Sequence, residues 1–239
     1  MARFRNIRDA VLRVRKAEIG TPQPPLRVAD IGCGAGAQAS LWEELGHRVL
    51  GLDVNQALVE IARERAAASG LGSEFWVGSA TDLPWPDQSV DVCLLPELLE
   101  HVPEWERCLD EACRVLARGG VLFLSTTNRL CPVQQEFRLP AYSWYPGPIK
   151  RWCVGLAKGR APWIAGYATY PAVNWFTPGQ LRRALESRGF NVWDRFAFTG
   201  ADQATSLKAG LLGAIRKVAP LRALALAATP YSSVIGVRR

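Results

Sequence analysis

The fold is decided by the stretch Val28-Ala29-Asp30-Ile31-Gly32-Cys33-Gly34-Ala35-Gly36, an apolar run that ends in an acid and then in three glycines at alternate positions. The pattern predicts a strand that turns tightly into a helix over residues 37–45. Glycine lets the backbone take positive φ and lets a ligand approach without a Cβ in the way. The free N–H groups and the positive dipole end of the helix suit a carboxylate or a phosphate. We therefore expect a ligand with a polar, partly charged body at this turn.

Two cofactor classes fit the turn. With Ala37 in the last position, the glycines satisfy the dinucleotide-binding fingerprint, and Asp53 would be the ribose-binding acid after the next strand. The acid two residues before the first glycine, together with the strict alternation, instead resembles motif I of class I S-adenosylmethionine-dependent methyltransferases. This resemblance extends in order and spacing over residues 26–128.

Hydrophobic patterning predicts the elements around the turn. Strands are expected over residues 48–53, 89–95, 121–127, 189–198 and 232–237, the last of them antiparallel, and a strand followed by a loop over residues 74–80. Helices are expected over residues 55–69, 177–188 and 206–228, the last of them with a break at Pro220. A further helix is expected to end at residues 114–120. With the resemblance, these elements imply an α/β fold: a Rossmann-like, seven-stranded, mostly parallel sheet with helices on both faces and an aromatic-rich insertion after the fifth strand.

Two further motifs narrow the resemblance. Residues 97–103, Glu97-Leu98-Leu99-Glu100-His101-Val102-Pro103, and residues 122–129 resemble the ubiquinone-biosynthesis O-methyltransferase group. The family resemblance implies that S-adenosylmethionine binds with its methionine end at Asp30, Gly32, Gly34 and Gly36, its ribose at Asp53 and its adenine beside Ser79 and Ala80. Cys33, Val54, Leu95 and Pro96 complete the implied cofactor set. Ser79 departs from the pattern, because many relatives carry an aspartate there; its hydroxyl or Asp82 could substitute.

Glu97, Glu100 and His101 are the candidate catalytic residues, because positions i, i+3 and i+4 converge on one face of a helix. His101 could act as the general base that takes a proton from a hydroxyl acceptor, since an ordinary imidazole pKa is about 6.5. Alternatively, the three side chains could bind a divalent cation such as Mg²⁺ that orients the acceptor. A purely structural role for all three also stays open. His47, before the second strand, is expected at the surface.

The 239 residues predict a single methyltransferase domain in four parts. These are a basic N-terminal helix (1–24), a cofactor-binding core (25–128), a substrate-cap insertion (129–176) and the C-terminal part of the sheet with an inserted helix (177–239). The insertion shows no obvious regular pattern and is rich in aromatic residues. Tyr142, Trp144, Tyr145 and Trp175 are its candidate contacts to a small-molecule acceptor, although aromatic side chains could equally pack the cap.

The net charge of +7 is distributed unevenly. Residues 21–128 hold seven basic and sixteen acidic groups, whereas residues 1–20, 129–160 and 205–239 are basic. The first two basic segments are amphipathic or aromatic, so contact with an anionic membrane surface is one interpretation and packing on the domain the other. Nucleic acid is a third, weaker partner class. The six cysteines form no CxxC pair, and the chain shows no signal-peptide core, so we expect a cytoplasmic protein with reduced thiols, peripheral at the inner face of a membrane if the first interpretation holds.

Taken together, these features predict an S-adenosylmethionine-dependent methyltransferase that acts on oxygen of a small hydrophobic or aromatic acceptor, polyprenyl-like, quinone-like or a specialised metabolite. Two alternatives remain open at this stage. One is a non-catalytic, cofactor-binding partner subunit; the other is an NAD(P)-dependent oxidoreductase.

Overall fold

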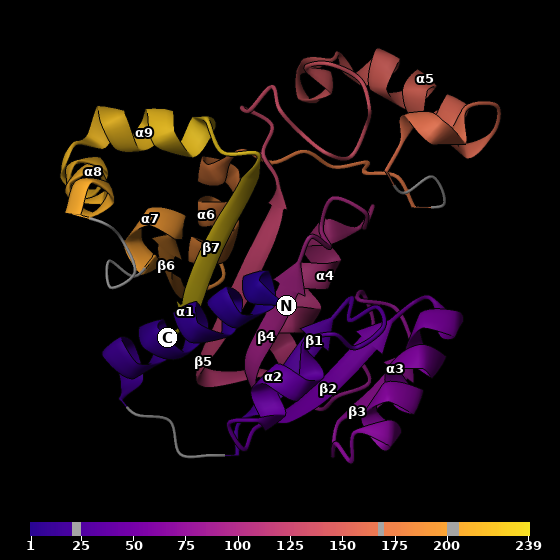
Figure 1. Ribbon diagram of the computed structural model, residues 1–239, viewed down its shortest axis with the longest axis vertical. Helices are drawn as coiled ribbons and strands as arrows, with labels where there is room; N and C mark the ends of the chain where they lie inside the picture. Colours follow the sequence, from indigo (N-terminus) through magenta and orange to yellow (C-terminus); the bar gives the residue numbers. More distant parts are fainter. Residues whose placement is uncertain (21–24, 167–169, 200–205) are drawn as a thin grey trace.

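A computed structural model describes residues 1–20, 25–166, 170–199 and 206–239, with side chains from residue 209 onward in the last range. Seven strands form one sheet in the order β3-β2-β1-β4-β5-β7-β6 (Figure 1). The strands are β1 (Arg27–Ile31), β2 (Arg48–Asp53), β3 (Glu74–Val77), β4 (Val90–Pro96), β5 (Leu116–Thr127), β6 (Phe190–Asp194) and β7 (Tyr231–Arg238). Strands β1 to β5 pair in parallel, and β7 runs antiparallel to β5 and β6. The predicted fold class is confirmed.

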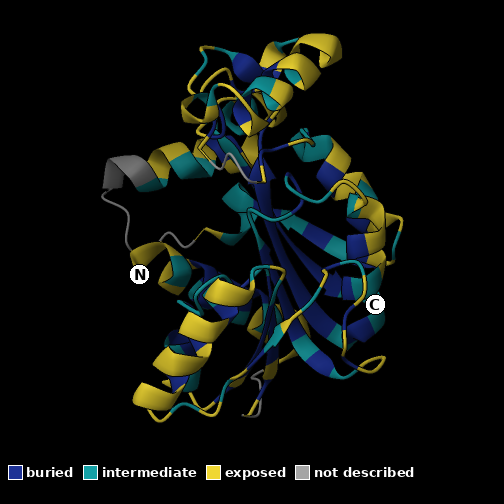
Figure 2. Ribbon diagram, turned by 90° about the vertical axis from the view of Figure 1, so that its right-hand side faces the viewer, coloured by how far each residue is buried: buried dark blue, intermediate teal, exposed yellow. Residues whose placement is uncertain are grey.

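Helices cover both faces of the sheet, which is buried between them (Figure 2). Helices α1 (Ala2–Ile19), α2 (Ala39–Glu43) and α3 (Gln56–Ala68) pack on one face; α4 (Trp105–Val115) and α6 (Pro178–Glu186) pack on the other. Along β1, Val28 faces the first layer and Ala29 the second, as the two-residue period of a doubly covered strand requires. The helix starts at Asn55 and Thr177 are capped as their residue types favour, through hydrogen bonds from Leu58 N and Gln180 N.

The apolar face of α1 belongs to the core. Ile7, Ala10, Val11 and Val14 are buried in one hydrophobic cluster with residues of β5 and β7, and Figure 1 shows α1 crossing in front of these strands. Of the two interpretations of this amphipathic segment, the structure therefore supports packing on the domain for its apolar face. Of its cations, Arg8 is buried and donates to Leu41 O, whereas Arg3, Arg5, Arg13 and Lys16 are exposed.

Three local predictions were wrong. Residues 117–120 belong to β5 and do not end a helix. The expected strand over residues 189–198 stops at Asp194, whose carboxylate accepts hydrogen bonds from Phe196 N and Ala197 N and so begins α7 (Arg195–Phe198). His47 was expected at the surface but is buried, and its Nδ1 accepts a hydrogen bond of 3.3 Å from Leu26 N.

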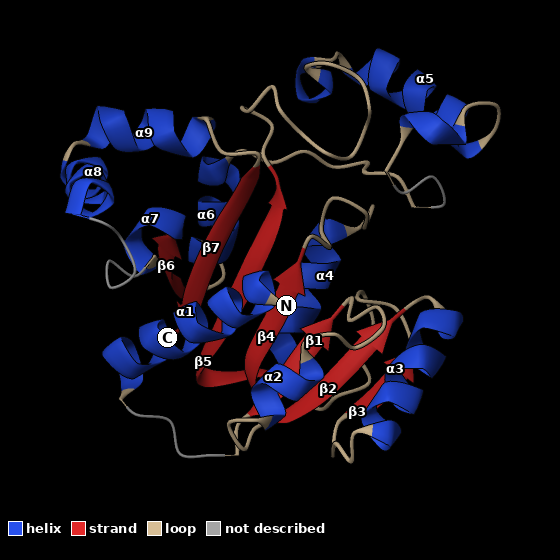
Figure 3. Ribbon diagram, in the orientation of Figure 1, coloured by secondary structure: helices blue, strands red, loops and turns tan. Residues whose placement is uncertain are grey.

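The insertion after β5 contains more regular structure than its sequence indicated. It forms η1 (Tyr142–Trp144), α5 (Gly147–Lys158) and η2 (Pro162–Ile164) around a small core of its own: Phe137, Tyr142, Cys153, Ala157 and Ala165. Figure 3 shows it beyond the arrowhead of β5, above the carboxyl ends of the strands. The expected break occurs two residues earlier, at Val218, between α8 (Ser206–Lys217) and α9 (Ala219–Ala227), and Pro220 lies in the first turn of α9. All six cysteines are free, and none of the described helices is long and apolar enough to cross a bilayer.

Candidate active site

The turn after β1 is held by the neighbouring strand. Gly32 N and Cys33 N both donate to Leu52 O, at 2.7 and 3.0 Å. Gly36 has φ +69°, and a Cβ there would lie 3.0 Å from both the Ala62 Cβ and the Phe75 ring, so this glycine permits close packing. Gly34 has φ +51°, and a Cβ there would meet nothing within 4 Å. The turn thus presents bare backbone toward open space at Gly34, as a ligand cradle requires.

Two carboxylates border the turn. Asp53 Oδ2 accepts a hydrogen bond of 2.9 Å from Gly34 N, and its Oδ1 accepts one from Asn55 N. Asp30 is fully buried and accepts from the Gln38 amide. Burial and the nearby Asp53 raise the pKa of Asp30 to about 7. Among the described residues no cationic side chain pairs with either carboxylate, so the crevice favours a ligand that carries positive charge.

The loop after β4 does not form the helix that the i, i+3, i+4 spacing suggested. Glu97 has φ +54°, and its carboxylate forms an ion pair of 2.6 Å with Arg3 of α1. Glu97 therefore lies outside the group of ligand atoms that contains Glu100 and His101, although its charge still acts on both. The expected convergence of these three side chains is wrong, because the chain leaves β4 in a turn and the arginine of a distant helix neutralises Glu97.

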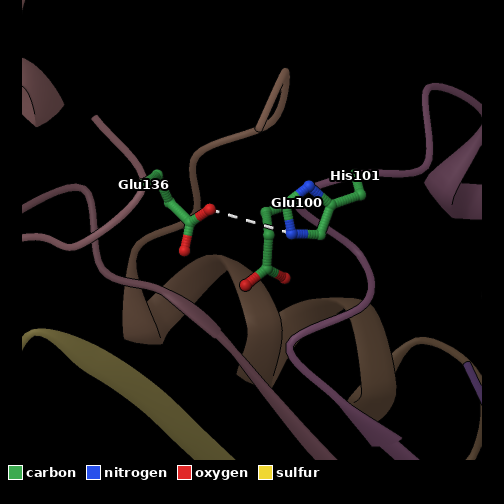
Figure 4. A group of neighbouring side chains, drawn as sticks. All are labelled: Glu100, His101 and Glu136. Carbon is green, nitrogen blue, oxygen red and sulfur yellow. Dashed lines mark ion pairs between the residues drawn. The ribbon is translucent and has the colours of Figure 1, made fainter. Parts of the chain in front are cut away.

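A different carboxylate takes that place. Glu100, His101 and Glu136 each offer a ligand atom within 4.8 Å of the others (Figure 4). His101 Nε2 lies 3.7 Å from Glu136 Oε2, and both glutamates are buried. Glu136 comes from the insertion and was missed by sequence reasoning. One signal could have found it: Glu136 is the only acid among residues 129–160, where six residues are basic.

The loop that carries Glu100 is fastened by the end of the insertion. Asn174 Nδ2 donates to Leu99 O at 3.0 Å and to Val102 O at 2.6 Å, while Val173 N and Asn174 N donate to Glu100 O. One asparagine thus satisfies backbone carbonyls on both sides of Glu100. No short-range pattern in the sequence indicates this contact, since about 75 residues of chain separate the partners.

Comparison with known proteins agrees with this architecture. A family model described as a methyltransferase domain matches residues 29–124, which run from β1 through β5. A ubiquinone biosynthesis O-methyltransferase of Brucella anthropi is 30% identical over 202 residues, covering 82% of this chain and 73% of that protein. The chain belongs to the class I S-adenosylmethionine-dependent methyltransferases. A second ubiquinone biosynthesis O-methyltransferase, from Sinorhizobium fredii, is 29% identical over 195 residues, 81% of this chain and 72% of its own.

A solved structure shows the same fold. The S-adenosylmethionine-dependent methyltransferase of Mesorhizobium loti superposes with a TM-score of 0.58 at 22% identity, over 96% of this chain and 98% of its own. Family membership resolves the choice between the two cofactor classes at the glycine turn in favour of S-adenosylmethionine, and makes this methyltransferase an enzyme rather than a non-catalytic subunit.

The remaining residues predicted to contact the cofactor differ in how far they are buried. Ser79 is exposed and its hydroxyl bonds to Thr81 Oγ1 at 2.7 Å, whereas Ala80 is buried beside it. Val54 is 54% exposed next to Asp53. Leu95 is fully buried in the cluster that faces α4 and α6, so its side chain is closed to a ligand. Cys33 is buried at the turn, and Pro96 ends β4 half-buried.

Burial dominates the electrostatics of the Glu100 cluster. It raises the pKa of Glu100 to about 8 and that of Glu136 to about 7, and lowers the pKa of His101. Neither carboxylate oxygen of Glu100 makes a hydrogen bond of normal geometry with another described residue, although the Thr126 hydroxyl lies nearby. Two buried carboxyls and an imidazole without a protein cation are stable when protons or a metal ion balance their charge. The donor set fits a divalent cation.

The four candidate acceptor contacts do not act alike. Tyr142 is fully buried and stacks on Phe137 with ring centroids 4.0 Å apart, so it packs the cap and cannot face an acceptor. Trp175 packs edge-on against Tyr142, with Lys150 Nζ 4.4 Å above its ring. Tyr145 lies half-buried beside them. Trp144 is 61% exposed and donates its indole N–H to Leu130 O.

Proposed function

We propose that this methyltransferase transfers a methyl group to an oxygen of a small hydrophobic or aromatic hydroxyl acceptor, polyprenyl-like, quinone-like or a specialised metabolite. The observation that carries the proposal is the buried Glu100, His101 and Glu136 cluster beyond the carboxyl end of β4, beside the cofactor crevice. A hydroxyl must lose its proton when its oxygen is methylated, and this cluster offers proton acceptors. Two relatives named as O-methyltransferases, those of Sinorhizobium fredii and Brucella anthropi, support the same acceptor atom.

The glycine turn fits S-adenosylmethionine. When bound, this cofactor supplies a methyl group on a positively charged sulfur. In the proposed arrangement Asp30 and the turn of Gly32, Gly34 and Gly36 receive its methionine end, where an uncompensated carboxylate favours cationic groups. Asp53 has lone pairs left for the ribose hydroxyls, because each of its oxygens accepts one backbone N–H. Ser79 and Ala80 would border the adenine.

In the proposed mechanism the chain orients the acceptor and holds its proton. Holding two reactants in line contributes up to about 7–11 kcal/mol in favourable cases. The lowered pKa of His101 keeps its imidazole neutral at neutral pH, so His101 can take the hydroxyl proton. Glu136, 3.7 Å from His101 Nε2, would stabilise the imidazolium that forms. Asn174 keeps the loop in place through Leu99 O and Val102 O.

A divalent cation such as Mg²⁺ is the second part of the proposal. Glu100, His101 and Glu136 would hold it, in place of the sequence-based set that included Glu97. The oxygens of Glu100 support this, since a buried carboxylate is costly when the Thr126 hydroxyl and its own backbone are the only described hydrogen-bonding groups near it. A bound cation would orient an acceptor hydroxyl and lower its pKa.

Peripheral contact with an anionic membrane remains a proposal for the insertion. Trp144, Trp152 and Trp163 are each more than 60% exposed, on the part of the chain that carries Lys150 and Arg151. Tryptophan favours the headgroup layer, and cations favour anionic lipid. Sedimentation with anionic vesicles at low salt tests this, and a protein that stays in the supernatant contradicts it. Replacing Trp152 and Trp163 by Ala should reduce the bound fraction.

The function is tested by methyl transfer from labelled S-adenosylmethionine to a panel of catechols that includes polyprenylated members. We expect labelled monomethyl ether, and roughly 100-fold slower turnover for His101→Ala with an unchanged cofactor dissociation constant. His47→Ala is the matched control because His47 lies before β2, away from the cluster; it should turn over normally if it remains folded. Unchanged turnover in His101→Ala would exclude the proposed role of His101. Product methylated only on nitrogen or carbon would contradict the O-methyltransferase assignment.

A further inference from the structure

A cavity of about 840 Å³ lies between α1, α7 and the strands β5 and β7. None of its lining residues belongs to the glycine turn or is Asp53, so it is separate from the cofactor crevice. Its lining does reach the reacting end of the site through Glu97, which follows β4, through Ser125 near the carboxyl end of β5, and through Gln135, the neighbour of Glu136. The cavity therefore adjoins the loop and the segment that supply the Glu100 cluster.

The walls of the cavity are partly aromatic. Phe123 of β5 and Phe198 of α7 meet edge to face, with ring centroids 6.5 Å apart. Tyr231 of β7 also lines the cavity, and its hydroxyl donates to Gln135 Oε1 at 3.3 Å. Such walls favour a flat, partly apolar molecule.

The charges of the described residues that line the cavity do not balance. Asp9 pairs with Arg8 at 2.8 Å, and Glu97 pairs with Arg3 at 2.6 Å. The two other charged lining residues are Arg13 and Arg195, and neither has a carboxylate partner in the described parts of the chain. Two cationic side chains are thus left facing a partly aromatic cavity.

Arg195 is the more confined of these two cations. The adjacent Asp194 is unavailable to it, because that carboxylate pairs with Arg222 at 2.7 Å and caps α7. The Arg195 guanidinium makes one hydrogen bond to a described residue, from its Nη1 to Tyr231 O at 3.3 Å, and burial lowers its pKa. A guanidinium has five N–H donors and is costly to bury without an anion. Arg13 is exposed and donates to Phe198 O.

We propose that this cavity binds an acidic aromatic acceptor, with Arg195 as the partner of its anionic group and the hydroxyl end directed past Glu97 toward Glu100 and His101. The identification of the ligand as the acceptor rests on the proposed function; the binding of an aromatic anion at Arg195 does not. Arg195 would select acidic acceptors over neutral ones, because a guanidinium gains charge-assisted hydrogen bonds only from an anion.

Two fluorescent probes test the binding step without cofactor or turnover. 8-Anilinonaphthalene-1-sulfonate carries an anionic group, and N-phenyl-1-naphthylamine has the same ring skeleton without it. We expect the wild-type protein to bind the sulfonate more tightly, and Arg195→Gln to weaken sulfonate binding roughly tenfold or more while leaving the neutral probe unchanged. Arg195→Lys should restore part of the affinity. Arg182→Gln is the control, because Arg182 pairs with Glu186 on the surface of α6.

Equal loss of both probes in Arg195→Gln, with Arg195→Lys equally impaired, would overturn the proposal by showing a collapsed cavity. Unchanged sulfonate affinity in Arg195→Gln would overturn it as well. In the methyl-transfer assay, Arg195→Gln should raise the KM for 3,4-dihydroxyphenylacetate and spare that for the neutral 4-(2-hydroxyethyl)catechol. Charge-selective probe binding in a protein that methylates no hydroxyl would overturn the O-methyltransferase function and leave the anion site intact.

Discussion

Around the glycine turn, the groups that would hold the cofactor come from residues 30–55, whereas the loop over residues 97–102 is held by residues as far apart in the chain as Arg3 and Asn174. The first region is placed by parallel pairing of β1 with β2, and its contacts reach the backbone of the next strand. The second is closed by side chains of an N-terminal helix and of the insertion after β5. One region is built by neighbours in the chain and the other by the whole fold.

This difference separates two kinds of specificity. A cofactor shared by a family can be held by a short motif, because backbone N–H groups and two carboxylates are enough to receive it. Where the acceptor differs between relatives, the residues that line its binding site must differ as well. Here α1, the insertion and α7 supply those residues. Changes in the first region should therefore alter cofactor affinity and local charge balance, and changes in the second should alter turnover and acceptor choice.

The largest effect is expected at the buried carboxyl of the first region. The unfolded chain releases the Asp30 proton near pH 4 and the folded chain near pH 7, so stability without cofactor falls as the pH rises between these values. Asp30→Asn removes this loss, up to about 4 kcal/mol from the shift in pKa. In urea unfolding, the free energy of unfolding of the variant should increase relative to that of the wild type from pH 5 to pH 8. Asp110→Asn, at the surface, is the control; parallel curves for Asp30→Asn and wild type would refute the expectation.

Cofactor affinity tests the same region more directly. Asp53→Ala removes the acceptor of Gly34 N and the proposed ribose contact, so the dissociation constant for S-adenosylmethionine should rise roughly tenfold to 100-fold. Calorimetry with S-adenosylmethionine and, for comparison, NADH measures this. Asp110→Ala, on the exposed surface of α4, provides the control variant. An Asp53→Ala protein with full affinity would show that the cofactor lies elsewhere.

Asn174 tests the second region. Asn174→Ala deletes two side-chain hydrogen bonds to the loop around Glu100, and we expect a loss of about 1–3 kcal/mol in stability with slower turnover. Cofactor affinity should stay close to wild type, because the glycine turn makes no contact with Asn174. Asn191→Ala, which removes a bond to Arg239 at the sheet edge, is the matched control. A selective loss of cofactor affinity in Asn174→Ala would erase the distinction between the two regions.

The smallest effect is expected at Arg3. Its ion pair with Glu97 is half-exposed, with 50% and 26% of the two side chains accessible, and such pairs contribute about 0–1 kcal/mol. Arg3→Gln should therefore change the thermal midpoint little. It leaves Glu97 unpaired at the cavity, so affinity for an anionic acceptor should fall slightly, as measured by KM. A shift of the thermal midpoint as large as that of Asn174→Ala would mean that Arg3 stabilises the protein through more than its ion pair with Glu97.

Much of the sheet could be predicted because its central strands, such as β4 and β5, are covered on both faces and therefore contain long apolar runs. The boundaries that failed lie where side chains decide the outcome. Asp194 ends β6 because its carboxylate caps the start of α7. Gly119 and Gly120 belong to β5, whereas the sequence predicted the end of a helix there. The helix α5 was missed among aromatic residues, although Pro148 in its first turn and the spacing of Ile149, Cys153 and Leu156 are helix signals.

The site divides in the same way. The acids and glycines of the cofactor crevice are recognisable from the sequence because they lie in or directly after the paired strands β1 and β2. The cluster was only half recognised, since His101 and Glu100 are adjacent in sequence while Glu136 arrives from the insertion. Glu97 was misplaced because a helix was assumed where φ is +54°. Tyr142 was taken for an acceptor contact, yet its ring is needed inside the cap.

By itself, the sequence determined the family, the seven-stranded sheet and the glycine crevice, because these depend on local periodicity and on backbone geometry that glycine permits. Only the tertiary structure decided that Glu136 joins Glu100 and His101 and that Arg3 neutralises Glu97. It also decided that Arg195, which has no carboxylate partner among the described residues, faces a partly aromatic cavity. These pairings form between segments brought together by packing of α1, α7 and the insertion on the sheet. Charge balance among distant side chains is a property of the fold, and no short stretch of the sequence contains it.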